Sequence, residues 1–329
     1  MKLKQKIETI ADLAKIRFLG QKIPVAVRWN LTNKCPSRCT YCTLWKTPVS
    51  ELKTEQIFRA LDELAKMGTK TISYSGGEPL LRDDIGRIVS YTKKKGISPS
   101  MNSNGFGFTK RVKELRDLDL IKISLDGPAK VAALTRGRKE AYSWAIKAAE
   151  TAKGAGIRFS FATTITRFNK DSLPYMANLA IKYGTMVAFQ PLKTIYRGVK
   201  WNSKVYPSKS EWKKIMRVLR SLKRNYPENV RNSDLLISYI ANWPNYEKLR
   251  CFAGKVFCII DPNGDVLPCD RVDLPMGAKP NLVKMGSFRA AFEKMPVFSC
   301  SGCGFCGAME LNFLLNGKWR GLKEAGKLV

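Results

Sequence analysis

The stretch Cys35-Pro-Ser-Arg-Cys39-Thr-Tyr-Cys42 places three cysteines within eight residues, and no fourth cysteine lies nearby. It follows directly on the apolar run 24–32, which is typical of a buried strand, so we expect the cysteines on a loop at the end of that strand. A [4Fe–4S] cluster normally takes four thiolates, one for each iron. Three thiolates hold three irons and leave the fourth iron open to another ligand. The stretch therefore predicts an iron–sulfur cluster on Cys35, Cys39 and Cys42.

Structural zinc is the alternative for this loop, because Cys-x2-Cys is also a zinc spacing. The Cys-x3-Cys-x2-Cys pattern argues against zinc, since neither a fourth cysteine nor a histidine is at hand. The chain contains no histidine at all. Any metal centre must therefore be held by cysteine, and any proton acceptor must be Glu, Asp, Lys, Tyr or Cys.

The cysteine spacing resembles the signature of the radical S-adenosylmethionine (radical SAM) enzymes, and three later motifs resemble that family in the same order. They are Ser75-Gly-Gly-Glu-Pro79, Asn102-Ser-Asn-Gly105 and Ser124-Leu-Asp-Gly127, each at the end of a predicted strand. Each motif alone is weak, whereas four in register at successive strand ends are specific. The resemblance covers residues 24–195, and a second, separate one covers residues 251–312.

Apolar runs and helical stripes alternate along the first part of the chain. Strands are predicted at 25–32, 70–75, 98–102, 120–125, 157–164 and 186–192, and helices near 54–67, 82–95, 108–117, 139–155 and 171–183. Strands joined by helical crossovers form a parallel sheet, and reactive groups gather at the carboxyl ends of its strands. Six β/α units are too few for a closed eightfold barrel. The predicted fold class is α/β, a partial (β/α)6 TIM-like barrel with a small C-terminal cysteine-rich module of β-hairpin and helix.

The sequence divides into four predicted parts. These are an N-terminal amphipathic helix (1–23), a radical SAM core (24–204), a helical bridge (205–249) and an auxiliary-cluster domain (250–329). The N-terminal helix packs on the barrel or lies on a membrane surface. No run of 18 apolar residues and no secretory signal is present. We therefore expect a cytoplasmic protein, with a peripheral membrane contact left open.

The resemblance also implies a site for S-adenosylmethionine (SAM) beside the first cluster. The open iron would take the amino and carboxylate groups of the methionine end of SAM, and Glu78 would accept hydrogen bonds from its ammonium group. Tyr41 would lie near the adenine, and Gly76 and Gly77 would let the backbone approach the ligand closely. The remaining polar contacts to SAM are expected from Asn102, Asn104, Ser124 and Arg136.

Two features of this region depart from the family pattern or carry no predicted role. Ala132 and Ala133 replace the family's His and Asp, so only Arg136 carries over from that segment. Asp126-Gly127 is interpreted as a turn. The resemblance implies that cluster reduction cleaves SAM into methionine and a 5′-deoxyadenosyl radical, which abstracts hydrogen from a substrate. No residue is assigned a catalytic role beyond binding.

The C-terminal cysteines resemble the opening motif of the SPASM and twitch extensions of radical SAM enzymes, through Cys251-x12-Gly264-x4-Cys269. Asn263-Gly264 predicts a tight hairpin that would bring Cys251 and Cys269 together. The cysteines expected to hold one auxiliary [4Fe–4S] cluster are Cys251, Cys269, Cys300 and Cys303, with Cys258 and Cys306 as alternates or spare thiols. A zinc ribbon is the alternative for this segment.

The net charge of +31, from 58 Lys and Arg against 27 Asp and Glu, attracts acidic partners. An acidic electron donor of the flavodoxin or ferredoxin type, an anionic membrane surface and nucleic acid are the candidates. Nucleic acid is disfavoured, because only residues 196–201 mix aromatic and basic side chains as such surfaces do. A lysine-rich solvated surface without a specific partner is the plain alternative.

The leading interpretation is a radical SAM oxidoreductase or rearranging enzyme with one auxiliary cluster. Its substrate is a small molecule, a lipid precursor handled at the membrane surface, or a peptide. About 24 residues precede the predicted core, too few for an added leader-peptide-binding domain, which weighs against a peptide maturase. The rival from another class is a zinc- or nucleic-acid-binding protein without enzymatic activity.

Overall fold

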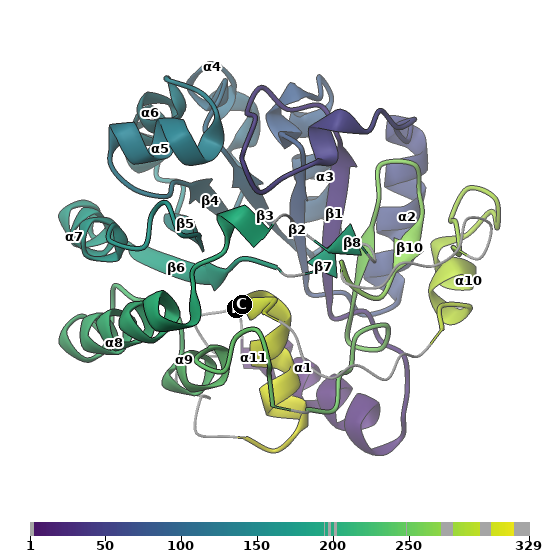
Figure 1. Ribbon diagram of the computed structural model, residues 1–329. Helices are drawn as coiled ribbons and strands as arrows, with labels where there is room; N and C mark the ends of the chain where they lie inside the picture. The colour runs from purple at the N-terminus through teal and green to yellow at the C-terminus, as the bar shows by residue number, and fades with distance from the viewer. Residues whose placement is uncertain are drawn as a thin grey trace.

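The computed structural model describes residues 3–193, 195–196, 199–200, 203–247, 249–270, 279–296 and 304–318. Its centre is a sheet of eight strands in the order β10-β9-β1-β2-β3-β4-β5-β6, curved into an open arc (Figure 1). The strands are β1 (Ala26–Thr32), β2 (Thr71–Gly76), β3 (Ser98–Ser103), β4 (Leu120–Ser124), β5 (Phe159–Ile165), β6 (Met186–Pro191), β9 (Phe257–Ile260) and β10 (Val266–Leu267). All neighbours pair in parallel except β10, which runs antiparallel to β9. The α/β class, the parallel arc and the six predicted strands are confirmed.

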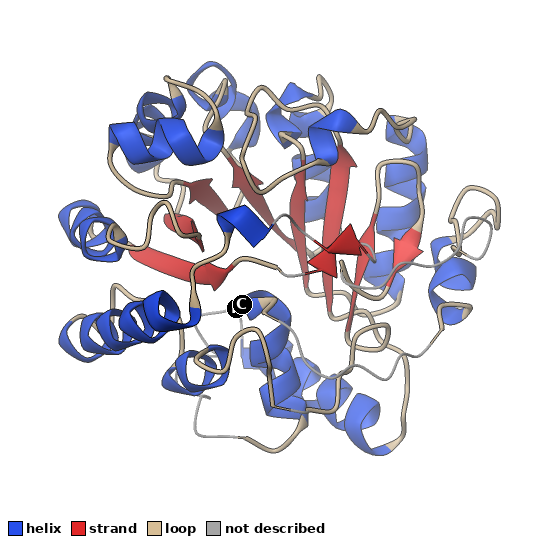
Figure 2. Cartoon of the chain, in the orientation of Figure 1, coloured by secondary structure: helices blue, strands red, loops and turns tan. Residues whose placement is uncertain are grey.

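Helices cover the outer face of the arc, and Figure 2 shows them around the strands. The crossover helices are α2 (Thr54–Lys66), α3 (Ile85–Lys94), α4 (Phe108–Arg111), α5 (Ala129–Arg136), α6 (Ala141–Gly154) and α7 (Leu173–Tyr183). Among these, α5 is not predicted from the sequence. The remaining elements are α8 (Lys209–Asn225), α9 (Asp234–Ile240), α10 (Phe288–Glu293), α11 (Cys306–Leu315), and the two-residue strands β7 (Ile195–Tyr196) and β8 (Val199–Lys200).

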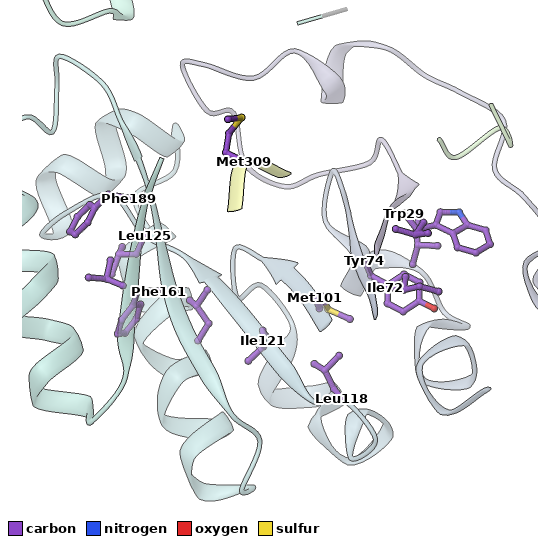
Figure 3. Packing of buried hydrophobic residues seen from close by; sticks show 14 of the residues in the cluster. Trp29, Ile72, Tyr74, Met101, Leu118, Ile121, Leu125, Phe161, Phe189 and Met309 are labelled. Atoms are coloured by element: carbon purple, nitrogen blue, oxygen red, sulfur yellow. The ribbon is translucent and has the colours of Figure 1, made fainter. Parts of the chain in front are cut away.

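The main core lies between the strands and the outer helices. Each strand sends alternate side chains outward, as β4 does with Ile121 and Ile123, both fully buried. Figure 3 shows Ile121 in one packed cluster with side chains of other strands, among them Ile72 and Phe161. The other face of each strand points into the arc and is less apolar, so the inner face is left for a site.

The C-terminal hairpin differs from the separate module expected of it. The β9–β10 hairpin forms as predicted, with Gly264 at φ +89 in its turn. However, β9 pairs in parallel with β1 and extends the barrel sheet itself. Asn30 Nδ2 donates to Asp261 Oδ1 at 3.0 Å across this junction. The C-terminal segment is therefore continuous with the sheet that carries the first cysteine loop.

The N-terminal helix α1 (Leu3–Phe18) uses its apolar stripe to pack on the protein. Ile16 is fully buried in a second core cluster with Val25 and Phe257. Ile10 and Phe18 are 67% and 80% exposed, so part of its apolar surface faces outward. Within the described part of the chain, no helix is both long and apolar enough to span a bilayer.

Candidate active site

A cavity of about 530 Å³ occupies the inside of the arc. Its wall is built from the inward-facing residues of the strands, such as Ser73 on β2, Ser100 on β3 and Lys122 on β4. Cys35, Cys39 and Cys42 line it where the loop leaves the carboxyl end of β1. The structure thus brings the three predicted cluster ligands to the edge of the sheet where the sequence places the site.

The cysteine loop is held on one side by the end of β2. Gly77 N–H donates to Thr32 O at 2.6 Å, and Glu78 N–H donates to Lys34 O at 2.8 Å. A Cβ atom on Gly76 would lie 2.3 Å from Thr32 O, and one on Gly77 would lie 2.2 Å from Lys34 O. Both glycines line the cavity, but the close approach that excludes a side chain is to the loop backbone, a neighbour that the sequence did not identify.

The other side of the loop is held by the C-terminal end of α5. Arg38 N–H donates to Arg136 O and Thr40 N–H donates to Thr135 O, both at 2.9 Å. A Cβ atom on Gly137 would lie 2.4 Å from Arg38 O, so the helix end and the loop are in direct backbone contact. The loop is therefore fixed from both sides.

Asp126 is a central residue that the sequence interpretation missed. Its side chain is fully buried, and it accepts from Tyr41 Oη at 2.7 Å, from Arg136 Nη2 at 2.9 Å and from Thr164 N–H at 3.0 Å. Burial lowers the pKa of Arg136, but the nearby Asp126 raises it, and the net result is above the usual value. The carboxylate fixes Tyr41 and Arg136 rather than forming a simple turn.

Tyr41 and Arg136, both expected to contact SAM, lie together at the cavity wall. The Arg136 guanidinium lies 5.7 Å from the centre of the Tyr41 ring, and both side chains line the cavity. Arg136 is held in an ion pair with Asp126. Burial raises the pKa of the Tyr41 phenol well above its usual value, and it stays a hydrogen-bond donor.

Glu78 also differs from its expected role. Its carboxylate is fully buried and accepts from Leu80 N–H at 3.2 Å, Ser103 Oγ at 2.9 Å and Asn104 N–H at 2.8 Å. Burial raises its pKa to about 7, against the effect of these donors. Glu78 is not among the residues lining the cavity. The structure points away from a contact between Glu78 and the ammonium of SAM, because the protein itself occupies both carboxylate oxygens.

The other predicted polar residues do line the cavity. Asn104 Nδ2 donates to Ser37 Oγ at 3.1 Å and lies 3.7 Å from Cys35 Sγ. Asn102 Nδ2 donates to Ser73 Oγ at 3.0 Å. Ser124 stands at the carboxyl end of β4 and lines the same space. These side chains are placed to contact a ligand beside the cysteines.

When the three thiols bind a metal they become negatively charged thiolates, and this charge needs cations nearby. Burial raises the pKa of Cys35 to about 11 and that of Cys39 to about 12, while Arg136 lowers both. Burial also raises the pKa of Cys42, which Arg28, Arg136 and Lys193 lower. Cations near all three sulfurs favour thiolates once a metal replaces the protons.

The donor set suits an iron–sulfur cluster. Cys35, Cys39 and Cys42 are half-buried thiols on one loop that is fixed from both sides, and the chain contains no histidine. Iron–sulfur clusters are normally held by cysteine thiolates, so these three side chains are donors of the required kind.

The C-terminal cysteines are placed only in part, since Cys300 and Cys303 lie outside the described residues. Asn312 Nδ2 on α11 lies 3.7 Å from Cys251 Sγ, and Cys306 at the start of α11 lines the cavity. Cys258 on β9 is fully buried, and burial raises its pKa. Cys269 is half-buried.

Comparison with known proteins agrees with this geometry. Residues 29–180 match the family model of the Radical SAM superfamily. The mycofactocin maturase MftC of Mycolicibacterium smegmatis is 27% identical in an alignment of 306 positions that covers 88% of this chain and 77% of MftC. The PqqA peptide cyclase of Methylocella silvestris is 26% identical over 88% of this chain and 82% of its own length. The crystal structure of Streptococcus suis SuiB bound to precursor peptide SuiA superposes with a TM-score of 0.65 at 15% identity, covering 94% of this chain and 77% of SuiB.

The chain therefore contains a radical SAM domain, and it is a radical SAM enzyme. SAM and a [4Fe–4S] cluster are the cofactors of that class of enzyme and of this chain. The likeness to SuiB supports the fold.

Proposed function

We propose that Cys35, Cys39 and Cys42 hold the [4Fe–4S] cluster and that the adjoining cavity takes SAM and then a substrate. The observation that carries this assignment is the fixation of the cysteine loop from both sides, by Gly77 of the β2 end and by Gly137 of the α5 end. When bound, the cluster and SAM supply one-electron cleavage of a carbon–sulfur bond and the radical that takes hydrogen from the substrate.

The protein's own residues position this chemistry. Asp126 fixes Arg136 and Tyr41 against the loop, and Glu78 fixes the backbone of Asn104 beside Cys35. Asn104 and Ser124 both line the cavity, which supports their assignment as SAM contacts. The cavity inside the arc lets side chains from several strands hold the reacting groups in a fixed orientation.

A peptide is the substrate class that we favour over a small molecule or a lipid precursor. The supporting observation is that a relative aligned over 88% of this chain is named as a cyclase of the peptide PqqA. That alignment weighs more than the expected lack of a leader-binding domain. The reaction is an oxidation or a radical rearrangement of that substrate.

We also propose one auxiliary [4Fe–4S] cluster of the SPASM or twitch type, on Cys251, Cys269, Cys300 and Cys303. The β9–β10 hairpin between Cys251 and Cys269 supports this assignment. Cys306 is the favoured alternate ligand because it is half-buried at the start of α11, whereas Cys258, which also lines the cavity, is a fully buried thiol on a core strand. A full set of protein ligands would let this cluster pass an electron to or from the substrate.

The external partner is an acidic electron donor of the flavodoxin or ferredoxin type, in keeping with the net charge of +31. A peripheral membrane contact is a second proposal, since Ile10, Phe18 and Leu19 leave apolar surface exposed on and after α1. Replacing Phe18 and Leu19 by serine is expected to abolish flotation with anionic liposomes. Unchanged flotation would rule this contact out.

Metal analysis tests the proposed function. Anaerobically purified protein is expected to hold roughly eight irons per chain, in two clusters. The Cys39→Ala variant is expected to hold about four and to form no 5′-deoxyadenosine from SAM with dithionite. The Cys269→Ala variant is expected to lose the other four. Iron-free protein that contains zinc, or 5′-deoxyadenosine from the Cys39→Ala variant, would overturn the assignment.

A further inference from the structure

The inner face of the arc carries a group of three cations, Arg28, Lys122 and Arg231. Arg28 lies on β1 and Lys122 on β4, both at inward-facing positions of their strands. Arg231 follows Val230, which forms a β-bridge with Val187 of β6, and the backbone N–H of Arg231 donates to Val187 O. All three line the cavity, and both arginines lower the pKa of Lys122 through charge repulsion. The three positive charges therefore face the same space.

Lys122 has neutral partners only. Its Nζ donates to Ser73 Oγ at 3.3 Å and to Ser100 Oγ at 3.4 Å, and no carboxylate of a described residue pairs with it. Burial, followed by the repulsion from Arg231 and Arg28, lowers its pKa to about 7. An ammonium group held away from water without a counter-charge is costly, so an anion bound at this position would stabilise the charged form of Lys122.

The two arginines also have guanidinium donors that no described acceptor uses. The Arg231 guanidinium makes no hydrogen bond or ion pair with a described residue, and its pKa is lowered by burial against a weaker opposing effect of Glu310. Arg28 Nη1 pairs with Asp270 Oδ2 at 2.7 Å, but its Nε is buried without a hydrogen-bond partner. Donors remain on both guanidinium groups for a further acceptor.

The carboxylates of the cavity wall do not neutralise the positive charges of this group. The wall contains two, Asp119 and Glu310, against seven lysines and arginines. The Asp119 carboxylate accepts hydrogen bonds from Lys93 and Ser98, and the Glu310 carboxylate accepts one from Ser233. Carboxylates beside the wall pair with Lys70, Arg136, Arg28 and Lys193, but no ion pair between described residues involves Lys122 or Arg231.

We propose that the substrate carries an anionic group, a carboxylate or a phosphate, and that Lys122, Arg231 and Arg28 bind it inside the arc. This inference rests on the proposed function and specifies the substrate of the same site. SAM does not account for the cations, because its carboxylate is expected at the open iron beside the cysteines. Lys122 lies two residues before Ser124 on β4, about 7 Å further from the carboxyl edge.

The arrangement also orients the substrate. The anionic group enters first and binds in the middle of the arc, while the carbon that loses hydrogen stays near the carboxyl edge of the sheet. Molecules without an anionic group at a suitable distance from the reacting carbon are expected to be poor substrates. The cation group would thus determine both the class of substrate and its direction in the cavity.

Binding of simple anions tests this proposal. We would titrate inorganic phosphate, acetate, and one short peptide with either a free or an amidated C-terminus into the anaerobic, iron-loaded protein, with and without saturating SAM, and with calorimetry as the readout. The Lys122→Met variant is expected to weaken anion binding about 10- to 100-fold. The control Lys147→Met removes the same charge from an exposed position on α6 and is expected to have no effect.

The outcomes distinguish the possible anions from one another. They also distinguish failure of this proposal from failure of the proposed function. Binding of phosphate alone indicates a phosphorylated substrate, and preference for the free over the amidated peptide indicates a carboxylate. Loss of anion binding when SAM is present would overturn the proposal, because the cations would then serve SAM. Absence of any anion binding in protein that holds iron and forms 5′-deoxyadenosine would overturn this proposal and leave the proposed function intact.

Thermal unfolding gives an independent check on the variant. If Lys122 serves the fold, its replacement by methionine lowers the melting temperature. If it serves a ligand, removal of a buried unpaired charge keeps or raises the melting temperature while anion binding is lost. A lower melting temperature with unchanged anion affinity would contradict the proposal.

Discussion

Asp126 and Arg136 form a buried ion pair directly behind the cysteine loop, with Asp126 Oδ1 2.9 Å from Arg136 Nη2 and Asp126 Oδ2 2.8 Å from Arg136 Nε. The same arginine presents its backbone carbonyl to Arg38 of the loop. The pair therefore links the end of β4, the end of α5 and the cluster-binding loop. Its loss is expected to disturb the fold and the site together.

The Asp126→Asn variant is expected to lower the free energy of unfolding by about 3–5 kcal/mol, because it leaves a buried guanidinium without its counter-charge. Denaturant unfolding under anaerobic conditions measures this loss. The control Asp62→Asn breaks a surface pair with Lys95, whose two side chains are 37% and 33% exposed, and is expected to cost under about 1 kcal/mol. Equal losses in the two variants would contradict the role given to the buried pair.

The Gly77→Ala variant is expected to lose most of the iron at the first site. An alanine Cβ would lie 2.2 Å from Lys34 O, so the cysteine loop must move away from β2. Iron analysis and the visible absorption spectrum measure this effect. The matched control is Gly154→Ala at the end of α6, where nothing lies within 4 Å of the new methyl group and iron content should be unchanged. Full iron content in the Gly77→Ala protein would show that the contact is not needed.

The Glu78→Gln variant is expected to lower the free energy of unfolding by about 1–3 kcal/mol. The carboxylate accepts from three donors, and an amide NH2 group would face at least one of them without an acceptor. Denaturant unfolding measures this cost. The exposed Glu114→Gln is the control and should be nearly neutral, since the partner of Glu114 is Arg111 in an exposed ion pair. A neutral Glu78→Gln change would mean that Glu78 is free to serve a ligand.

The Lys122→Met variant is expected to differ from the wild type in a pH-dependent manner. The pKa of Lys122 is about 7 in the folded protein and near 10.5 when unfolded, so the unfolded chain binds more protons between these values. The wild type therefore gains stability as pH rises above 7. The advantage of the variant should be largest near pH 6 and shrink toward pH 9, while Lys147→Met shows no such trend. A constant difference would contradict the low pKa.

The sequence predicted the barrel because its signals are local. Each of the six strands is an apolar run bounded by turn residues, and each crossover helix except α5 shows an apolar face. Helix α5 was missed although Pro128 precedes it and Gly137 ends it, since its alanine-rich stretch has a weak apolar stripe. The three-cysteine loop was found because its spacing alone is specific.

The inner face of the arc was not predictable in the same way. Lys122 in Leu120-Ile-Lys-Ile-Ser124 fits a strand with one solvated face, and only the assembled sheet shows that this face points into a cavity. The partners of Asp126 and Glu78 come from segments far apart in the sequence. The pairing of β9 with β1 likewise depends on long-range packing, which no local pattern records.

That pairing covers the free edge of β1 only after most of the chain has been synthesised. Asn30 on β1 and Asp261 beyond β9 are 231 residues apart in the sequence, yet they are joined side by side. A nascent chain that ends before residue 257 has an unpaired β1 edge, directly ahead of the cysteines, and such edges invite aggregation. Closure of the β1 edge, directly ahead of the cysteine loop, therefore comes after synthesis of the β2 and α5 segments that hold the loop.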